Sequence, residues 1–253
     1  MKSSTFRASL ALAASLCASS FAHAATGEPP HWTYTGRHAD PGHWAALSPE
    51  FEACAKGRAQ SPVDIRSTVK ADLPALQFEY TPADPVLLNN GHTVQVNLPP
   101  GQQLVVGDRR YELVQFHFHT PSEEEIHGHR APMEAHFVHR DAEGRLAVVS
   151  VLLKSGPPNK AYAPVFDHLP RPGERISVDG LRLDLARLLP GHTGYYRFQG
   201  SLTTPPCSEG VQWIVLKQPV RLGAAQIRAF RKLFNTNARP VQPLNGRVVE
   251  ESA

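Results

Sequence analysis

The stretch Gln115-Phe116-His117-Phe118-His119 and the later stretch Glu134-Ala135-His136 organise this chain. Side chains on a β-strand alternate between its two faces. The polar residues of each stretch therefore share one face of a predicted strand, while the two phenylalanines of the first stretch share the other. The pattern predicts two neighbouring strands with one histidine-rich face and one face packed into a hydrophobic core.

Three imidazoles, those of His117, His119 and His136, predict a site for one metal ion. Neutral imidazole binds zinc well, and three protein ligands leave a fourth position for water, as in catalytic zinc sites. Gln115 and Glu134 each stand two residues before a histidine on its own strand face, where they can accept the second ring N–H and fix the ring. We therefore predict one zinc ion per chain, supported by Gln115 and Glu134.

The histidine spacing alone has other interpretations, because the chain contains 13 histidines. His127-Gly128-His129 repeats the spacing without the polar supports, and we expect it in a polar surface loop. The first alternative for the three candidate ligands is a set of hydrogen-bonded sheet histidines without a metal. The second is a cupin on a jelly-roll fold, with Glu123 as a further ligand, although no second half of the cupin motif follows.

Short apolar or alternating runs separated by turn residues predict a mainly β domain. With 253 residues, of which 41% are apolar and 19% charged, the chain fits one domain around an ample core. The predicted strands cover residues 76–80, 86–90, 93–98, 110–119, 132–140, 146–154, 195–199 and 212–217. The predicted helices cover residues 48–56, 181–188 and 224–234, and we expect them to lie over the sheet.

The N-terminus has the pattern of a secretory signal peptide. Lys2 and Arg7 precede or border an apolar run over residues 8–16, and Ala22-His23-Ala24 has the small-x-small form of a cleavage site. We expect a cleaved signal peptide at 1–24 and a mature, soluble domain at 25–253, since no later run approaches the roughly 20 apolar residues of a membrane span. A lipid anchor at Cys17 is disfavoured, because Leu16 before it is not small.

Charge and cysteine content bound the partners and the compartment. The formal net charge of +3 is small, and cleavage would remove two of the basic residues, so we expect no nucleic acid or membrane partner and a small-molecule substrate instead. Cys54 and Cys207 are the two cysteines beyond the signal peptide. An even count in an oxidising compartment predicts one disulfide, with two separate thiols as the alternative.

Seven blocks, including the two that carry the histidines, resemble in their order the α-class carbonic anhydrases across nearly all of the mature chain. The blocks are Gln60-Ser61-Pro62-Val63-Asp64-Ile65, Asn90-Gly91-His92, Gln115 to His119, Pro121-Ser122-Glu123, Glu134 to His139, Ser201-Leu202-Thr203-Thr204-Pro205-Pro206-Cys207 and Arg239-Pro240-Val241-Gln242-Pro243-Leu244. The resemblance implies a large, twisted, mostly antiparallel sheet with zinc at the bottom of a conical cleft. With its cysteine pair and signal peptide, the chain is similar to the exported bacterial branch, which is usually periplasmic.

This resemblance implies an enzyme that reversibly hydrates carbon dioxide to bicarbonate and a proton, using hydroxide bound to zinc. The three histidines are the implied ligands. Thr203 is implied to accept a hydrogen bond from the hydroxide and to donate its own proton to Glu123, because a carboxylate can only accept. His92 matches the proton shuttle, and an unperturbed pKa of about 6.5 suits that role near neutrality.

The resemblance also assigns the surroundings of the metal. The backbone carbonyl of Asn237 is implied to support a ligand histidine, and Tyr34 to join the water network of the cleft. Without the resemblance, Asn237 is a loop residue, and the apolar residues Val138, Val148, Leu202, Val211 and Trp213 are sheet core. The implied substrate pocket consists of Val138, Val148, Leu202, Thr204, Val211 and Trp213.

Two positions depart from the family pattern. Glu124 stands where many members carry histidine, and Ala238 where relatives often have a larger residue. Neither is a ligand, so we expect activity to be retained. Two other functions stay open at this point: a non-catalytic relative that binds proteins at the cleft edge, and a periplasmic zinc-binding protein. A homodimer also stays open.

Overall fold

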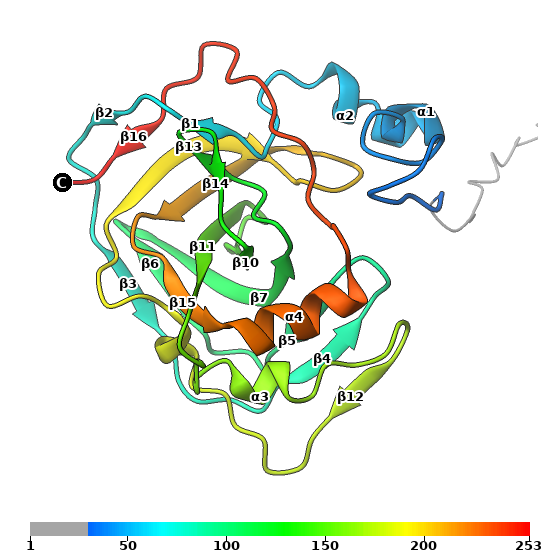
Figure 1. Ribbon diagram of the computed structural model, residues 1–253. Coiled ribbons are helices and arrows are strands. Elements are labelled where there is room, and N and C mark those ends of the chain that lie inside the picture. Colours follow the sequence, from blue (N-terminus) through cyan, green and yellow to red (C-terminus); the bar gives the residue numbers. More distant parts are fainter. Residues whose placement is uncertain (1–29) are drawn as a thin grey trace, which may run out of the picture.

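The computed structural model describes residues 30–253, and a single twisted sheet runs through them (Figure 1). The predicted signal peptide at 1–24 lies outside the described residues. Thirteen strands form the sheet, in the order β12-β4-β5-β7-β10-β11-β14-β13-β16-β2, with β3, β6 and β15 paired beside this path. Two central strands of that order, β7 and β10, are those predicted to carry the histidines.

The strands of the large sheet are mostly short, and two of them reach eleven residues. They are β2 (Val69–Lys70), β3 (Leu76–Glu79), β4 (Val86–Asn89), β5 (Val94–Asn97), β6 (Gln103–Val106), β7 (Arg109–His119), β10 (Met133–Arg140), β11 (Leu146–Gly156), β12 (Arg175–Ser177), β13 (Tyr195–Ser201), β14 (Glu209–Leu216), β15 (Val220–Gly223) and β16 (Glu250–Glu251). A second, small sheet contains β1 (Asp64–Ile65), β8 (Glu125–Ile126) and β9 (His129–Arg130).

Most strand pairs in the large sheet are antiparallel. The exceptions are the pairs β11 with β14, β11 with β15, and β16 with β2, which are parallel. The predicted fold class is therefore confirmed: the molecule is mainly β, with a large, mostly antiparallel central sheet and few short helices. Strands β2, β6, β12, β15 and β16 of this sheet and the three strands of the small sheet were not predicted.

The helices are short, and α4 packs over one face of the sheet, as expected for the segment at 224–234. They are α1 (Trp44–Leu47), η1 (Pro49–Phe51), α2 (Ala53–Lys56), α3 (Ala163–Phe166), η2 (Leu185–Leu188) and α4 (Ala224–Leu233), where η marks a 3-10 helix. Within residues 30–253, no helix combines the length and the apolar character needed to cross a membrane.

Two helix predictions were wrong in extent. The single helix expected at 48–56 is divided into η1 and α2, because Ser48 caps the 3-10 turn by accepting from the backbone N–H of Glu50, and α2 begins only at Ala53. The helix expected at 181–188 is only η2, because Leu183 forms a β-bridge with Ala83 and is held in extended backbone.

The hydrophobic residues form a core on each face of the sheet. The larger core contains Phe116, Phe118 and Phe137 from β7 and β10, and α4 adds Ile227 and Phe230 to it. The smaller core contains Val148, Phe198, Val211 and Trp213 from β11, β13 and β14, and Val138 of β10 packs against it. The phenylalanines buried in the larger core fix which face of β7 and β10 points away from that core.

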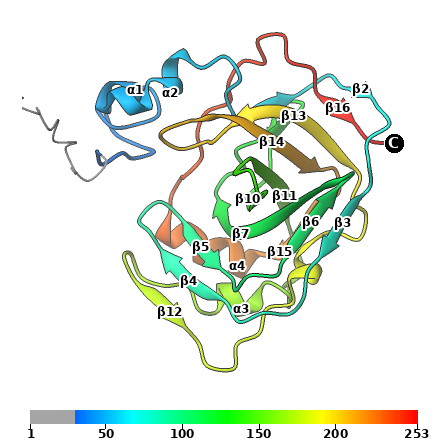
Figure 2. The ribbon, with the colours of Figure 1, turned by 180° about the vertical axis from the view of Figure 1, so that it is seen from behind.

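A third cluster joins the N-terminal segment to the loop after β13. Trp44 and Phe51 pack there against a disulfide between Cys54 and Cys207, so the predicted disulfide is confirmed. In both views of the ribbon, α1 and α2 lie at one end of the molecule, beside the loop between β13 and β14 (Figures 1 and 2). The disulfide therefore attaches this peripheral segment to the body of the sheet.

Candidate metal centre

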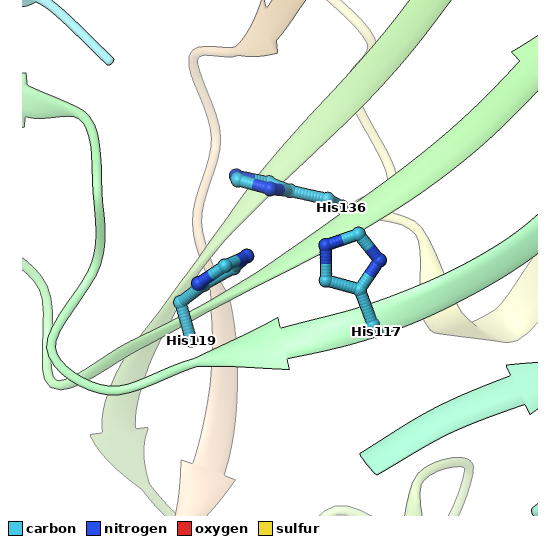
Figure 3. Close-up of side chains that lie close together, drawn as sticks. All are labelled: His117, His119 and His136. Atoms are coloured by element: carbon cyan, nitrogen blue, oxygen red, sulfur yellow. The ribbon is translucent and has the colours of Figure 1, made fainter. Parts of the chain in front are cut away.

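The three predicted ligands come together on neighbouring strands. In the antiparallel pairing of β7 and β10, His117 lies opposite His136, and His119 lies opposite Glu134. The rings of the three histidines converge (Figure 3), and one ring nitrogen of each lies within 4.8 Å of the others. Strand alternation thus places the imidazoles together on one face, while Phe116 and Phe118 point into the core on the other.

Hydrogen bonds fix the tautomers of two of these rings. Nδ1–H of His117 donates to Oε1 of Gln115 at 2.9 Å, and Nδ1–H of His119 donates to the backbone carbonyl of Asn237 at 2.7 Å. Because a carbonyl oxygen can only accept, the proton lies on Nδ1 in both rings, and Nε2 carries a lone pair. These are the nitrogens that face the shared point.

His136 has the opposite orientation. Its Nε2 lies 3.4 Å from a carboxyl oxygen of Glu134 and 3.4 Å from one of Glu124, which leaves Nδ1 toward the other rings. Burial opposes protonation of this ring, but the two carboxyl groups outweigh burial and raise the pKa of His136 to about 10. A carboxyl group behind a ligand histidine fixes its orientation and makes it a stronger donor to a metal.

The residues present fit a zinc ion. Nε2 of His119 is buried and has no hydrogen-bond partner among the described residues, although a buried polar atom normally has one. Burial lowers the pKa of His117 and of His119; neighbouring imidazoles lower the pKa of His117 further, and burial outweighs the opposing effect of Glu123 on His119, so both rings are neutral. His136, whose pKa is raised, would lose one proton on binding a metal, and three imidazoles on a partly open site then form the ligand set of catalytic zinc.

Glu123 is fully buried beside the ligands. Its Oε1 accepts from the backbone N–H of Arg239 at 2.7 Å, and its Oε2 lies 3.5 Å from Nε2 of His119. Within residues 30–253, Oε2 has no hydrogen-bond partner, so the expected bond from the hydroxyl of Thr203 is not formed in this structure and stays a prediction. Thr203 itself is buried in the loop that follows β13.

A cavity of about 140 Å³ is lined by two of the ligands, His117 and His119, and by His92. Its lining also includes Gln115, Tyr34 and Thr204. The ring of His92 stacks on Trp32, with centroids 3.7 Å apart. Burial, and then the neighbouring His31, lower the pKa of His92, so the ring is neutral at pH 7 and able to accept a proton.

The apolar residues assigned to the substrate pocket gather in the smaller core. Val148, Val211 and Trp213 are buried there, and Val138 and Leu202 pack against them. The indole of Trp213 meets the ring of His136 edge-on, with centroids 4.9 Å apart. This cluster therefore borders the metal centre, whereas Thr204 lies apart from it on the cavity wall.

Two features of the chain lie away from this centre. His127 is exposed in the turn between β8 and β9, as expected, whereas His129 is exposed but begins strand β9. A larger cavity, of about 830 Å³, lies between the start of β7 and β13, and none of the predicted site residues lines it. Size alone would have indicated the wrong cavity.

Sequence reasoning missed three contributors to the centre. Trp32 packs on His92, the hydroxyl of Ser150 donates to Glu134, and the guanidinium of Arg239 donates to Gln60 and to the carbonyls of Ser61 and Cys54. Ser150 pairs with His136 across β10 and β11, so strand alternation could have found it once that pairing was known. Trp32 and Arg239 lie in loops, where the sequence shows no alternating pattern that could indicate their positions.

A large, mostly antiparallel sheet with three converging histidines on two central strands defines a protein with a mononuclear, three-histidine metal site. The model of one protein family, eukaryotic-type carbonic anhydrase, matches residues 39–253. The chain therefore belongs to the eukaryotic-type, or α-class, carbonic anhydrase family. Its members use zinc to hydrate carbon dioxide, and the cupin alternative is excluded.

Similar proteins agree with this family over nearly the full length. The chain is 46% identical to a carbonic anhydrase of Neisseria gonorrhoeae, covering 93% of this chain and 94% of that one. It is 42% identical to a carbonic anhydrase of Pectobacterium carotovorum, covering 95% and 97%. The α-carbonic anhydrase of Thermovibrio ammonificans, solved with the inhibitor sulfanilamide, superposes with a TM-score of 0.84 at 45% identity, covering 87% of this chain and 99% of that one.

Proposed function

We propose that this chain catalyses the reversible hydration of carbon dioxide to bicarbonate and a proton, with one zinc ion held by His117, His119 and His136. The observation that carries the proposal is the convergence of three imidazoles in a chain of this family. Zinc supplies a Lewis acid that activates water near neutral pH, as carbonic anhydrases themselves exemplify. Gln115, Glu134 and the carbonyl of Asn237 orient the ligands.

Two residues beside the metal orient the attacking oxygen in this proposal. Glu123 is buried, and one of its carboxylate oxygens has no hydrogen-bond partner among the described residues. A carboxylate oxygen only accepts hydrogen bonds, so its partner must be a donor. The hydroxyl of Thr203 is the proposed donor, and its own lone pair then accepts from the nucleophile. The direction of these bonds aims a lone pair of the nucleophile at carbon dioxide.

Carbon dioxide is placed against the apolar cluster in this proposal. The substrate is nonpolar, and a wall formed by apolar side chains favours it over water. The proposed pocket residues are Val138, Val148, Leu202, Thr204, Val211 and Trp213.

His92 is the proposed exit for the proton. It lines the same cavity as two ligands, is half-buried, and has a lowered pKa, so it accepts a proton near neutrality and returns it easily to buffer. Tyr34 lines this cavity as well and would hydrogen-bond to its water. The route for the proton runs through the cavity and not through the sheet.

We also propose that the enzyme is exported. The disulfide between Cys54 and Cys207 fits an oxidising compartment, and the relatives in Neisseria and Pectobacterium are bacterial. Residues 1–24 would be the cleaved signal peptide, 25–253 the catalytic domain, and the periplasm its location. Its partners are carbon dioxide and bicarbonate; we expect neither nucleic acid nor membrane partners, and the protein is a monomer or a homodimer.

Stopped-flow carbon dioxide hydration tests the activity. Mature protein carrying one zinc per chain should accelerate hydration over buffer, lose the activity to a zinc chelator, and regain it when zinc is restored. His117→Ala should lose both the metal and the activity, because it removes a ligand. Failure of the zinc-loaded protein to exceed the buffer rate would remove the proposal, and several weakly held zinc ions per chain would point to zinc storage instead.

A further inference from the structure

Glu124 is the least explained polar residue near the metal centre. Its side chain is fully buried, and neither carboxyl oxygen has a hydrogen-bond partner among residues 30–253. Buried polar groups in native proteins are nearly always paired, so an unpaired carboxyl group calls for an explanation. Glu134 and His136 lie beside it, and Oε2 of Glu124 lies 3.4 Å from Nε2 of His136.

The second carboxyl group near Nε2 of His136 belongs to Glu134, and its capacity to accept is largely used. Oε2 of Glu134 accepts from the backbone N–H groups of Glu123 at 2.7 Å and of Glu124 at 3.2 Å. Its Oε1 accepts from the hydroxyl of Ser150. The oxygen of Glu134 that faces His136 thus already has two donors, whereas the oxygen of Glu124 that faces the same nitrogen has none.

The orientation of His136 requires an acceptor at this position. When Nδ1 faces the metal, the neutral ring carries its hydrogen on Nε2, and that N–H must find a partner in a fully buried site. Glu124 and Glu134 are equally distant from it. Free acceptor capacity therefore favours Glu124.

We propose that Glu124 is a positioning residue for the metal ligand His136, accepting its Nε2–H together with Glu134. Two carboxyl groups from different segments would then hold one ring, with Glu134 on β10 and Glu124 in the turn before β8. The ring would be less free to rotate away from the metal, and zinc would dissociate more slowly than with one support. This inference rests on the proposed role of His136 as a zinc ligand.

The neighbouring Glu125 provides a matched control. It follows Glu124 in the sequence but is partly exposed, and it pairs with Nε of Arg130 at 2.9 Å. The same substitution at Glu125 changes the same chemical group without touching His136. A difference between the two sites therefore reports position and not the general loss of a carboxyl group.

The test is the rate at which the zinc-loaded protein releases zinc to a chelator. Glu124→Met, which keeps the length of the side chain and removes the acceptor, should release zinc about tenfold faster or more. Glu125→Met should match the wild type. Glu124→Gln keeps an oxygen that can accept Nε2–H and should stay close to the wild type.

Each other outcome contradicts the proposal. Equal release from Glu124→Met and the wild type would make Glu124 a space-filling residue, and equal acceleration in Glu124→Gln and Glu124→Met would indicate an effect of charge and not of an acceptor. If the variants fail to fold, the wild-type protein provides the test. In the zinc-loaded wild type, a nuclear Overhauser effect should connect Nε2–H of His136 with the methylene protons of Glu124. The absence of this effect would overturn the proposal.

These results are separable from a failure of the proposed function. If His117→Ala retains zinc as firmly as the wild type, the metal is not bound at the three histidines, and the proposed site itself fails. If His117→Ala loses zinc while Glu124→Met retains it, the site stands and only the role of Glu124 is wrong.

Discussion

Individual histidines in this chain differ in chemistry because their surroundings differ. His117 and His119 are neutral and aimed by carbonyl acceptors, His136 is held against carboxyl groups, and His92 stacks on an indole at the cavity wall. The same side chain thus serves as ligand or as proton carrier. Burial and hydrogen-bond partners, rather than residue type, assign each role.

Replacing His92 tests proton transfer separately from metal binding. His92→Ala should keep one zinc per chain, because His92 is not one of the three converging ligands, and should slow hydration in dilute buffer by about a hundredfold, the low end of what general acid–base catalysis contributes. Concentrated imidazole buffer should restore much of the rate. His127→Ala, at an exposed turn, is the control, and an unchanged rate for His92→Ala in dilute buffer would exclude the shuttle role.

A fourth buried histidine should make stability depend on pH. Burial lowers the pKa of His139 to about 4, and its Nε2 lies 2.6 Å from the hydroxyl of Tyr80. Below pH 6.5 the unfolded chain binds a proton at this ring that the folded chain does not bind until about pH 4. The stability is therefore complete above pH 6.5, and about 3 kcal/mol of it is lost as the pH falls from 6.5 to 4.

Urea unfolding of metal-free wild type and metal-free His139→Gln, at pH 7 and pH 4, measures this effect. The variant keeps an acceptor for Tyr80 but cannot titrate, so its free energy of unfolding should fall by about 3 kcal/mol less than that of the wild type. Equal losses in the two proteins would show that His139 does not carry the effect.

Strands β7 and β10 each serve two parts of the molecule at once. Phe118 lies between two ligand histidines in the sequence, and its ring packs against Tyr162, Phe166 and Phe230 in the larger core. The metal site and the core are therefore built on the same backbone. A cavity created in the core beneath β7 should therefore also disturb the positions of the metal ligands on its other face.

Phe118→Ala should lower the free energy of unfolding by about 3–5 kcal/mol, the usual cost of removing a buried aromatic ring. Val114→Ala on the same strand is the control, because Val114 is 39% exposed and its truncation should cost little. Urea unfolding, with zinc content measured alongside, checks both variants. Similar losses for the two would show that Phe118 does not anchor β7 in the core.

Elements with a strong alternating pattern were the ones that sequence predicted. The patterns of β7, β10 and β11 were clear because long strands with two distinct faces repeat the signal several times. Strands β12 and β15 have three or four residues and no such repeat, and tertiary pairing alone defines them. The division of the segment at 48–56 depended on a local cap, which propensity does not resolve.

The candidate site was predictable only where its residues lie on one strand. The ligands, Gln115 and Glu134 follow from spacing along single strands. The stacking of Trp32 on His92 and the position of Glu124 behind His136 depend on how separate segments fold together. Contacts of this kind leave no mark on the spacing of residues, so the structure was needed to find them.

The whole molecule consists of a sheet with a peripheral segment attached to it. The disulfide links residues 153 apart in the sequence, and the segment it attaches carries Trp32 and Tyr34, which line the cavity beside His92. Cross-linking so long a loop contributes about 5 kcal/mol in the chain-entropy description. The cross-link thus acts on the rim of the site as well as on global stability.

Removing both cysteines tests this contribution. Cys54→Ala combined with Cys207→Ala should lower the free energy of unfolding by up to about 5 kcal/mol and should leave one zinc per chain, because no ligand lies in the attached segment. Urea unfolding and metal analysis measure the two properties, and the wild type under oxidising conditions is the reference. Loss of zinc from the folded double variant would show that the segment also supports the metal.

The central position of β7 and β10 in the sheet separates the backbone that carries the metal ligands from the N-terminal segment that borders the cavity. Both strands have neighbours on either side, so the backbone amides beneath the ligands should be among the last to exchange with solvent, while those of the attached N-terminal segment exchange early. Substitutions in the attached segment, at Trp32 or Tyr34, can then change the shape of the cavity, while the strands that carry the metal ligands keep their protection from exchange. Specificity and metal retention can therefore evolve on different parts of the chain.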